Sequence, residues 1–273
     1  MIRSISHWSM PEGSTVEQSM RLAKQAGYDA IELAVDETGE FSVETSAEDL
    51  AAIKAMADEI GLQLPTVASG MGWAYPSIGP DPAICARSRE LTIGSLDAAA
   101  ALGAEVLLCV PGSVTDDYAY DQALADLVTT FKGLAREAEK RGVIIGVENV
   151  WNKFMLSPIE FRDLIDEIGS PFVQVYFDVG NVVLTGFPDQ WIRILGERIK
   201  AVHFKDWKRD IGTIVGFIDL LEGDVPWDRV MAAFTEIGYN GAVTAEMMPP
   251  YQHFPERLLE ATRRSMDAIL TLG

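Results

Sequence analysis

The chain has 273 residues, 48% of them hydrophobic, and its 22 basic and 41 acidic residues give a net charge of −19. A chain of this length and composition can bury a large core, and we expect residues 1–273 to form a single α/β domain. So acidic a surface disfavours binding to nucleic acid or to anionic membranes, because both depend on contacts from Lys and Arg.

The remaining composition is typical of a protein of the reducing cytosol. Cys85 and Cys109 have neither the spacing of a metal site nor that of a redox motif. The first residues lack the apolar segment of a signal peptide, and no window has the apolar length of a membrane span. We therefore expect a soluble, cytoplasmic protein.

Along the chain, stretches with helical apolar spacing repeatedly end at a glycine that is followed by a short apolar run. A glycine after a helix supplies the left-handed residue that closes it, and the chain then turns into a sheet. Seven such glycines each precede a predicted strand: Gly27, Gly61, Gly103, Gly142, Gly169, Gly196 and Gly238. With a first strand at about residues 2–7, the sequence predicts eight strands.

Helical spacing fills the segments between these strands. The predicted helices cover residues 15–26, 46–60, 83–102, 122–140, 157–168, 190–195, 227–237 and 254–272. Apolar strands that alternate with helices indicate a parallel sheet covered by helices, and eight such units favour a closed (β/α)8 TIM barrel. A doubly wound open sheet is the alternative, but no Gly-rich phosphate-binding turn follows the first strand.

The last four predicted strands end at acidic or imidazole side chains: Glu148 in VIIGVENVWN, Asp178 in VQVYFDVGN, His203 in IKAVHFKDW and Glu246 in GAVTAEMM. One such acid is usually a helix cap or a surface residue, but four in succession are unusual because buried carboxylates need a partner. In a barrel the carboxyl ends of the strands lie together at one end, so these four side chains would be close to one another. Three carboxylates and one imidazole suit one divalent ion, with Mn²⁺, Mg²⁺ or Co²⁺ favoured and Zn²⁺ also compatible.

Tryptophans are predicted at the same end of the barrel, beyond the carboxyl ends of the strands. Trp8, Trp73, Trp151 and Trp207 follow the first, third, fifth and seventh predicted strands. Flat apolar rings there can stack on a sugar and exclude water, although large aromatic residues at strand ends also cap barrel cores. Together they favour a carbohydrate ligand. His7, beside Trp8, is either a further substrate contact or a packed histidine.

Two charged residues follow His203 closely. Lys205 alternates with His203 along the strand, so it could share the same face and meet a substrate oxygen or balance the carboxylates. Asp206 could accept a hydrogen bond from the second imidazole nitrogen, bind the substrate, or be an ordinary loop acid.

Several motifs occur in order: GYDAIELAVDET, GVENVWN, SPFVQVYFDVGNV, AVHFKD, EGDVPW and AEM. With them the chain resembles, over nearly its whole length, the xylose-isomerase-like TIM-barrel superfamily of sugar isomerases and epimerases. It resembles most closely the ketose and ketose-phosphate 3-epimerases, such as L-ribulose-5-phosphate 3-epimerases. The resemblance implies a metal site of Glu148, Asp178, His203 and Glu246. It further implies that Glu148 and Glu246 are an acid/base pair on opposite faces of the sugar.

The resemblance also implies contacts with a sugar. Glu32 is similar to a residue that contacts a substrate hydroxyl in these proteins, although a solvated or Lys-paired glutamate is the alternative, and Asn181 of the DVGN motif is a further candidate contact. Leu221 takes the place of one glycine in their usual Gly-Glu-Gly turn, and the third loop lacks the histidine of phosphate-handling members. Phosphorylated and free sugars both stay open. A homodimer or homotetramer is also implied.

The activity that follows is a divalent-metal-dependent epimerase or aldose–ketose isomerase. It would act by proton abstraction next to the carbonyl, a metal-stabilised enediolate and reprotonation. The same site could serve a metal-dependent dehydratase of a keto-cyclitol such as an inosose, and a non-catalytic sugar-binding barrel is an alternative from another class. A relative of the AP endonucleases fits poorly, because the chain has only three histidines and an acidic surface.

Overall fold

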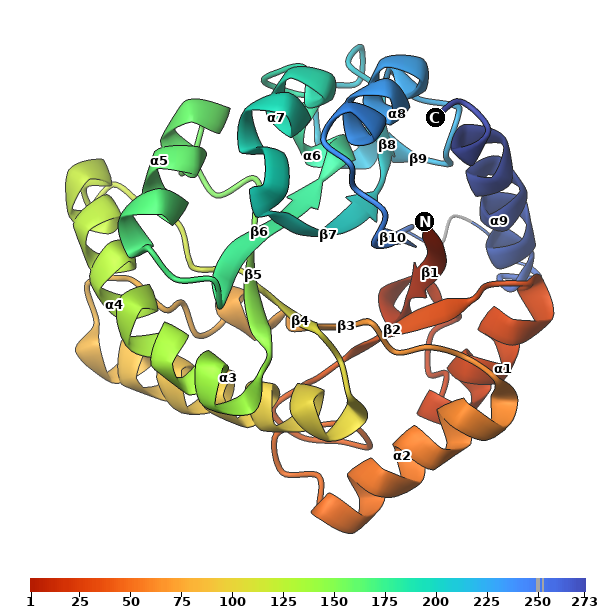
Figure 1. Ribbon diagram of the computed structural model, residues 1–273, viewed down its shortest axis with the longest axis horizontal. Helices are drawn as coiled ribbons and strands as arrows, with labels where there is room; N and C mark the ends of the chain where they lie inside the picture. The colour runs from red at the N-terminus through yellow and green to blue at the C-terminus, as the bar shows by residue number, and fades with distance from the viewer. Residues whose placement is uncertain (249–250, 252) are drawn as a thin grey trace.

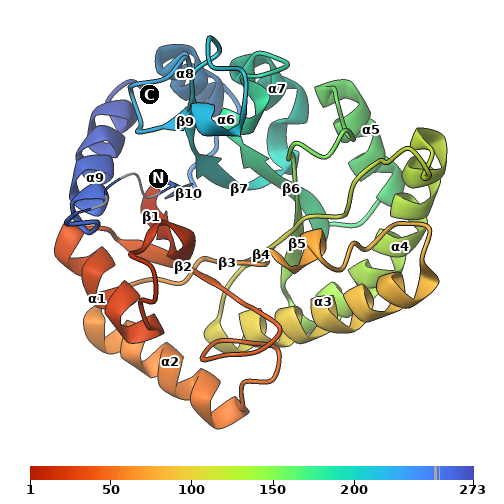
Figure 2. The ribbon, with the colours of Figure 1, turned by 180° about the vertical axis from the view of Figure 1, so that it is seen from behind.

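The computed structural model describes residues 1–248, 251 and 253–273, which fold into a closed parallel barrel surrounded by helices (Figures 1 and 2). The eight barrel strands are β1 (Ile2–Ser6), β2 (Ala30–Ala34), β3 (Thr66–Ala68), β4 (Val106–Cys109), β5 (Ile144–Glu148), β6 (Val173–Asp178), β7 (Ile199–Phe204) and β10 (Ala242–Ala245). Each pairs in parallel with the next, and β10 closes the ring onto β1. The predicted (β/α)8 barrel is confirmed, and the open sheet is wrong.

Helices form the outer ring of the molecule (Figure 1). They are α1 (Val16–Ala26), α2 (Ala47–Ile60), α3 (Pro82–Leu102), α4 (Tyr120–Arg141), α5 (Pro158–Ile168), α6 (Val179–Val182), α7 (Pro188–Leu195), α8 (Trp227–Glu236) and α9 (Arg257–Leu270). Each predicted helix is present, with ends that differ by a few residues, and the short α6 is additional. Among the described helices, none is both long and apolar enough to cross a bilayer.

The helix ends follow from the local sequence. Thr15 starts α1 with a capping box, because its side chain accepts a hydrogen bond from the Gln18 N–H while the Gln18 side chain accepts one from the Thr15 N–H. Gly27 then ends the helix with a φ of 89°, a left-handed conformation that other residues adopt only with strain. All seven glycines predicted to close helices have a positive φ, so the glycine pattern identified the helix–strand junctions.

Alternation along the strands places the functional residues inside the barrel. Tyr176 and Ala201 belong to a small apolar cluster that is separate from the larger core between sheet and helices. Asp178 and His203 follow these two residues by two positions, so they lie on the same inward face, one layer nearer the carboxyl ends of the strands.

One connection is more elaborate than a turn. Between β7 and α8 the chain forms a two-stranded antiparallel hairpin, β8 (Asp206–Trp207) with β9 (Phe217–Ile218), beside the barrel mouth (Figure 1). The sequence did not predict this hairpin, because its strands are two residues long and show no alternating pattern.

Candidate active site

The structure brings the four predicted strand-end side chains together. Glu148 and Asp178 are the last residues of β5 and β6, His203 is next to last in β7, and Glu246 follows β10 directly. One ligand atom from each lies within 4.8 Å of the other three. Glu148, Asp178 and His203 are buried, and the Glu246 side chain is 19% exposed. The cluster therefore sits at the floor of the barrel mouth.

This cluster has the polar chemistry of a cation site. Glu148 Oε1, Asp178 Oδ2 and His203 Nδ1 are buried and make no hydrogen bond of good geometry with the described residues, although Lys205 Nζ approaches Asp178 Oδ2 and Glu246 Oε2 approaches His203 Nδ1. His203 Nδ1 lies 3.5 Å from Glu148 Oε1, 3.9 Å from Asp178 Oδ2 and 2.7 Å from Glu246 Oε2. Buried polar atoms without partners are costly, and a hard divalent cation would satisfy them. The residues therefore fit a divalent ion.

With only protein charges around them, the two glutamates of the cluster differ in their proton affinity. Burial raises the pKa of the Glu148 carboxyl to about 7, against the opposing effect of His203. Burial also acts to raise the pKa of Glu246, but Lys205 and His203 outweigh it and lower that pKa to about 2. Two carboxylates with separated pKa values can take different roles in proton transfer.

Lys205 neutralises part of the negative charge. Its Nζ lies 3.0 Å from Asp178 Oδ2 and 2.9 Å from Glu246 Oε2, and these carboxylates raise its pKa despite burial. Of the two roles predicted for Lys205, balancing the carboxylates is the one that these contacts support.

Glu32 lies beneath the cluster and not in the cavity above it. Its side chain is fully buried, and its Oε1 lies 2.8 Å from His203 Nε2. Its Oε2 accepts hydrogen bonds from Thr66 Oγ1 at 2.7 Å and from Tyr176 Oη at 2.5 Å. Glu32 is therefore not placed for the predicted contact with a substrate hydroxyl, because the protein itself occupies the carboxylate. Glu32 instead orients the imidazole so that Nδ1 faces the other three predicted ligands.

Of the roles left open for Asp206, the hydrogen bond with the second imidazole nitrogen of His203 is not formed. The Asp206 carboxylate is buried and accepts four hydrogen bonds from its own loop, at distances of 2.9 to 3.2 Å. The donors are the backbone N–H groups of Trp207, Leu221 and Val225 and the indole of Trp227. Asp206 therefore stabilises the hairpin loop beside the mouth, and Glu32 is the residue that contacts the second imidazole nitrogen of His203.

Leu221 adopts the backbone conformation of a glycine, with a φ of 75°. A left-handed conformation costs a non-glycine residue about 1–3 kcal/mol, and the Leu221 side chain is half exposed, so little packing is at stake. Glycine removes this backbone strain but loses more conformational entropy on folding than leucine does. The net effect of Leu221→Gly is expected to be a stabilisation of about 1 kcal/mol and a Tm about 2–4 °C higher. Leu272→Gly is the control for thermal denaturation, because Leu272 is equally exposed (49% for both) with no left-handed φ. A lower Tm for Leu221→Gly would contradict the argument.

Two adjacent loops fix one wall of the site. The Asn149 side-chain oxygen accepts a hydrogen bond from the Asp178 N–H at 2.9 Å, and the Asn149 side-chain NH₂ donates one to the Asp178 carbonyl at 2.8 Å. The Asn181 amide donates to the Asn149 carbonyl at 3.0 Å, and the Trp151 indole donates to the Asn181 carbonyl at 2.9 Å. These reciprocal bonds lock the loop after β5 onto α6 and hold the Trp151 ring in place.

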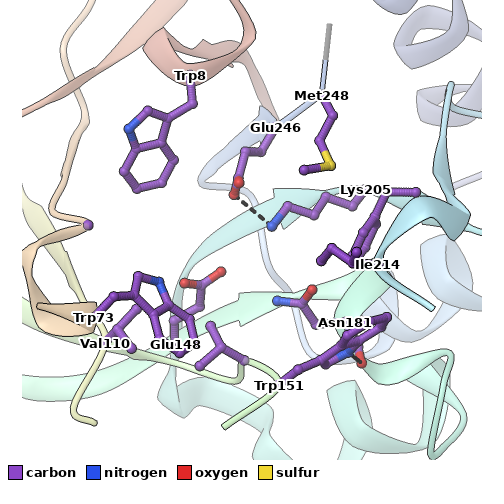
Figure 3. Close-up of a pocket in the computed structure, with 13 residues that line it drawn as sticks. Trp8, Trp73, Val110, Glu148, Trp151, Asn181, Lys205, Ile214, Glu246 and Met248 are labelled. Carbon is purple, nitrogen blue, oxygen red and sulfur yellow. Dashed lines mark hydrogen bonds and ion pairs between the residues drawn. The ribbon is translucent and has the colours of Figure 1, made fainter. Parts of the chain in front are cut away.

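A cavity of about 330 Å³ opens above the cluster (Figure 3). Glu148 and Glu246 reach into it from opposite sides, with their carboxylates directed toward each other. Its walls include Val110 and five of the predicted contacts: Trp8, Trp73, Trp151, Asn181 and Lys205. Trp207 is buried behind this wall, edge-on to Trp151 at 5.5 Å between ring centres. Stacking on a ligand thus fits Trp8, Trp73 and Trp151, and capping of the core fits Trp207.

Other placements differ from the prediction. His7 adjoins Trp8 but does not line the cavity, and burial lowers its pKa. Ile214 and Phe217 from the hairpin loop and Met248 after β10 do line it, and sequence reasoning missed them. The only signal was the long, partly apolar segment IGTIVGFIDLL, which belongs to no predicted helix or strand.

Comparisons with known proteins give relatives of similar sequence and structures of similar fold. L-ribulose-5-phosphate 3-epimerase UlaE of Salmonella typhimurium is 26% identical over 242 residues, which cover 88% of this chain and 84% of that protein. The structure of D-allulose 3-epimerase from Methylomonas sp. in complex with D-allulose is 20% identical, with a TM-score of 0.79 and coverage of 98% and 96% of the two chains. That of the IOLI protein with a bound zinc atom is 17% identical, with a TM-score of 0.83 and coverage of 99% and 98%.

The two structural matches, at these identities, show the fold alone. A sequence model described as the xylose isomerase-like TIM barrel matches residues 20–269 and so spans nearly all of the chain. The protein therefore belongs to the xylose isomerase-like TIM barrel family.

Proposed function

We propose that this protein is a divalent-metal-dependent ketose epimerase or isomerase, and that it inverts C3 of a ketose. The observation that carries the proposal is the pair Glu148 and Glu246, which face each other across the floor of one cavity beside Asp178 and His203. The name of the UlaE relative, a 3-epimerase, supports the choice of carbon.

The arrangement suits removal and return of a proton next to a carbonyl. One glutamate would take the proton from C3, leaving an enediolate, and the other would deliver a proton to the opposite face, which inverts the stereocentre. Lys205 would neutralise part of the negative charge of Asp178 and Glu246 during this exchange. The rings of Trp8, Trp73 and Trp151 would stack on the sugar and exclude water from the reactive intermediate.

Glu148, Asp178, His203 and Glu246 would hold the divalent ion. When bound, such an ion acts as a Lewis acid that lowers the cost of negative charge on the carbonyl oxygen. Treatment with a chelator is expected to abolish activity, and Mn²⁺, Mg²⁺ or Co²⁺ to restore it. Isothermal titration should show one ion per chain, and Asp178→Asn should weaken this binding.

The test is proton exchange in D₂O with a panel of pentuloses and hexuloses and their phosphates, followed by NMR. Deuterium at C3 together with the C3 epimer would support the proposal. Deuterium at C1 or C2 together with an aldose would indicate an aldose–ketose isomerase, and loss of water would indicate a dehydratase. The absence of exchange with every ketose and every metal would overturn the proposed function and favour a binding barrel.

Gly180→Ala tests how closely the lysine must be placed. A Cβ on Gly180 would come within 2.5 Å of Lys205 Cβ and 3.0 Å of the Lys205 carbonyl, so the end of β7 or α6 must move. A shift of the order of 1 Å at a reacting group costs about 100-fold in rate, and we expect kcat/KM to fall by about that factor. Gly133→Ala in α4 is the control, because its methyl group meets only the flexible end of Arg89 at 3.4 Å. Equal activity in the two variants would contradict this role of Gly180.

A further inference from the structure

The cavity has a charged floor and an apolar rim. Glu148 is buried at the floor, and Lys205 reaches it from β7. At the rim, Trp73 and Ile214 are each 55% exposed and Met248 is 59% exposed, yet all three line the same cavity (Figure 3). The end of a ligand that lies farthest from the carboxylates would therefore meet an aromatic ring, an aliphatic chain and a thioether.

The positive charge of Lys205, at the floor of the cavity, is already paired with carboxylates. Lys205 is the single basic side chain among the described residues that line the cavity, and it is paired with Asp178 and Glu246 at 3.0 and 2.9 Å. When all three are ionised, Glu148, Asp178 and Glu246 carry three negative charges. Lys205 and one divalent ion would balance those three, with nothing left to pair with a further anion.

The place where TIM barrels often bind phosphate is apolar among the described residues that line the cavity. Phosphate groups usually sit in the loops after strands seven and eight of such barrels. Here the loop after β7 lines the cavity with Ile214 and Phe217, and the segment after β10 lines it with Met248. The three residues outside the described ranges are uncharged: Pro249, Pro250 and Gln252.

The hairpin loop carries two basic residues, and neither lines the cavity. Lys208 and Arg209 are exposed and do not line the cavity. The Arg209 guanidinium lies 5.7 Å from the centre of the Phe187 ring, at the start of α7. The sequence thus places basic residues near the mouth, but neither of these two side chains lines the cavity.

We infer that the site accepts uncharged ketoses and rejects ketose phosphates, an inference that rests on the proposed function. A phosphate monoester carries close to two negative charges and binds where Arg, Lys or backbone N–H groups converge. At this rim it would lose part of its hydration to apolar side chains and find no counter-charge, which is unfavourable. The substrate class would then differ from the phosphorylated sugar in the name of the UlaE relative.

Matched pairs of substrates test the inference. L-ribulose is compared with L-ribulose 5-phosphate, and D-fructose with D-fructose 6-phosphate, by C3 exchange with the Mn²⁺-loaded protein. We expect kcat/KM for the free ketose to exceed that of its phosphate by about 100-fold or more. A second readout is quenching of tryptophan fluorescence, which free ketoses are expected to cause at lower concentration than their phosphates, with no competition from inorganic phosphate.

A charge added at the rim gives a matched pair of variants. Ile214→Arg places a cation in the cavity wall, and it is expected to shift the kcat/KM ratio toward the phosphate by about 10-fold or more. Ile211→Arg adds the same charge to the same exposed loop but outside the cavity lining, and it is expected to leave the ratio unchanged.

The outcomes separate the two proposals. Preference of the wild-type protein for a ketose phosphate, in exchange or in binding, would overturn this inference and leave the proposed function standing. A ratio that shifts equally in both variants would overturn the rim argument. Neither exchange nor binding with any ketose would overturn the proposed function and this inference with it.

Discussion

Replacing either Glu148 or Glu246 with glutamine is expected to lower the rate of ketose epimerisation by about 10²- to 10⁴-fold. Glutamine keeps the size of the side chain and one oxygen, but it can neither take nor return the proton. Because the two carboxylates reach the cavity from opposite sides, each variant retains the base that faces one epimer. Each should therefore still exchange the C3 proton of one epimer in D₂O while failing to convert it into the other.

The decisive measurement is C3 exchange starting from each pure epimer, because the two variants should lose exchange from opposite epimers. Glu222→Gln removes an exposed carboxylate from the loop beside the mouth and controls for the loss of one negative charge. Metal content by elemental analysis shows whether each variant still binds the ion. Loss of exchange from the same epimer in both variants would contradict a mechanism with two opposed bases.

Much of this site could be predicted from the sequence because its residues are fixed by local patterns. A glycine such as Gly142 ends a helix, a short apolar strand follows, and Glu148 comes at its end. Parallel strands in a closed barrel bring such ends to one place, so four local patterns were enough to predict one cluster. The same argument placed Trp8, Trp73 and Trp151 near that cluster, since each lies within five residues of the end of a strand.

The rest depends on contacts between distant parts of the chain. Glu32 and His203 are 171 positions apart, and an acid within β2 looks no different in sequence from a substrate contact. Asp206 lies three residues from His203 and looked like its partner, but the hairpin turns its carboxylate into its own loop. The apolar rim was missed for a related reason, because Ile214 and Phe217 reach the cavity only through that hairpin.

Glu32→Gln is expected to weaken the binding of a divalent ion by about 10- to 100-fold. The Glu32 carboxylate accepts hydrogen bonds from Tyr176 and Thr66 and lies 2.8 Å from His203 Nε2. This acceptor keeps the proton of a neutral imidazole on Nε2 and leaves the Nδ1 lone pair free to face Glu148, Asp178 and Glu246. A glutamine can instead donate to Nε2, which permits the tautomer with a proton on Nδ1.

Affinity is measured by isothermal titration with Mn²⁺, and the tautomer by ¹⁵N NMR of the histidines in the Mg²⁺-loaded protein. The chain has only three histidines, so the His203 signals can be assigned by single substitution. The wild-type protein should show a proton on Nε2 alone, and Glu32→Gln a mixture of tautomers. Tyr176→Phe removes one hydrogen bond but keeps the carboxylate, so it should preserve the tautomer and lower the affinity less.

These variants separate orientation of the imidazole from mere stability of the barrel interior. Leaving a buried polar group of this network without its partner costs about 1–3 kcal/mol, so both Glu32→Gln and Tyr176→Phe should lower the Tm. Only Glu32→Gln should change the protonated nitrogen of His203. If the two variants lose the same affinity and keep the same tautomer, Glu32 contributes to packing alone. If the tautomer changes with the affinity, this buried glutamate sets the direction in which His203 presents its lone pair.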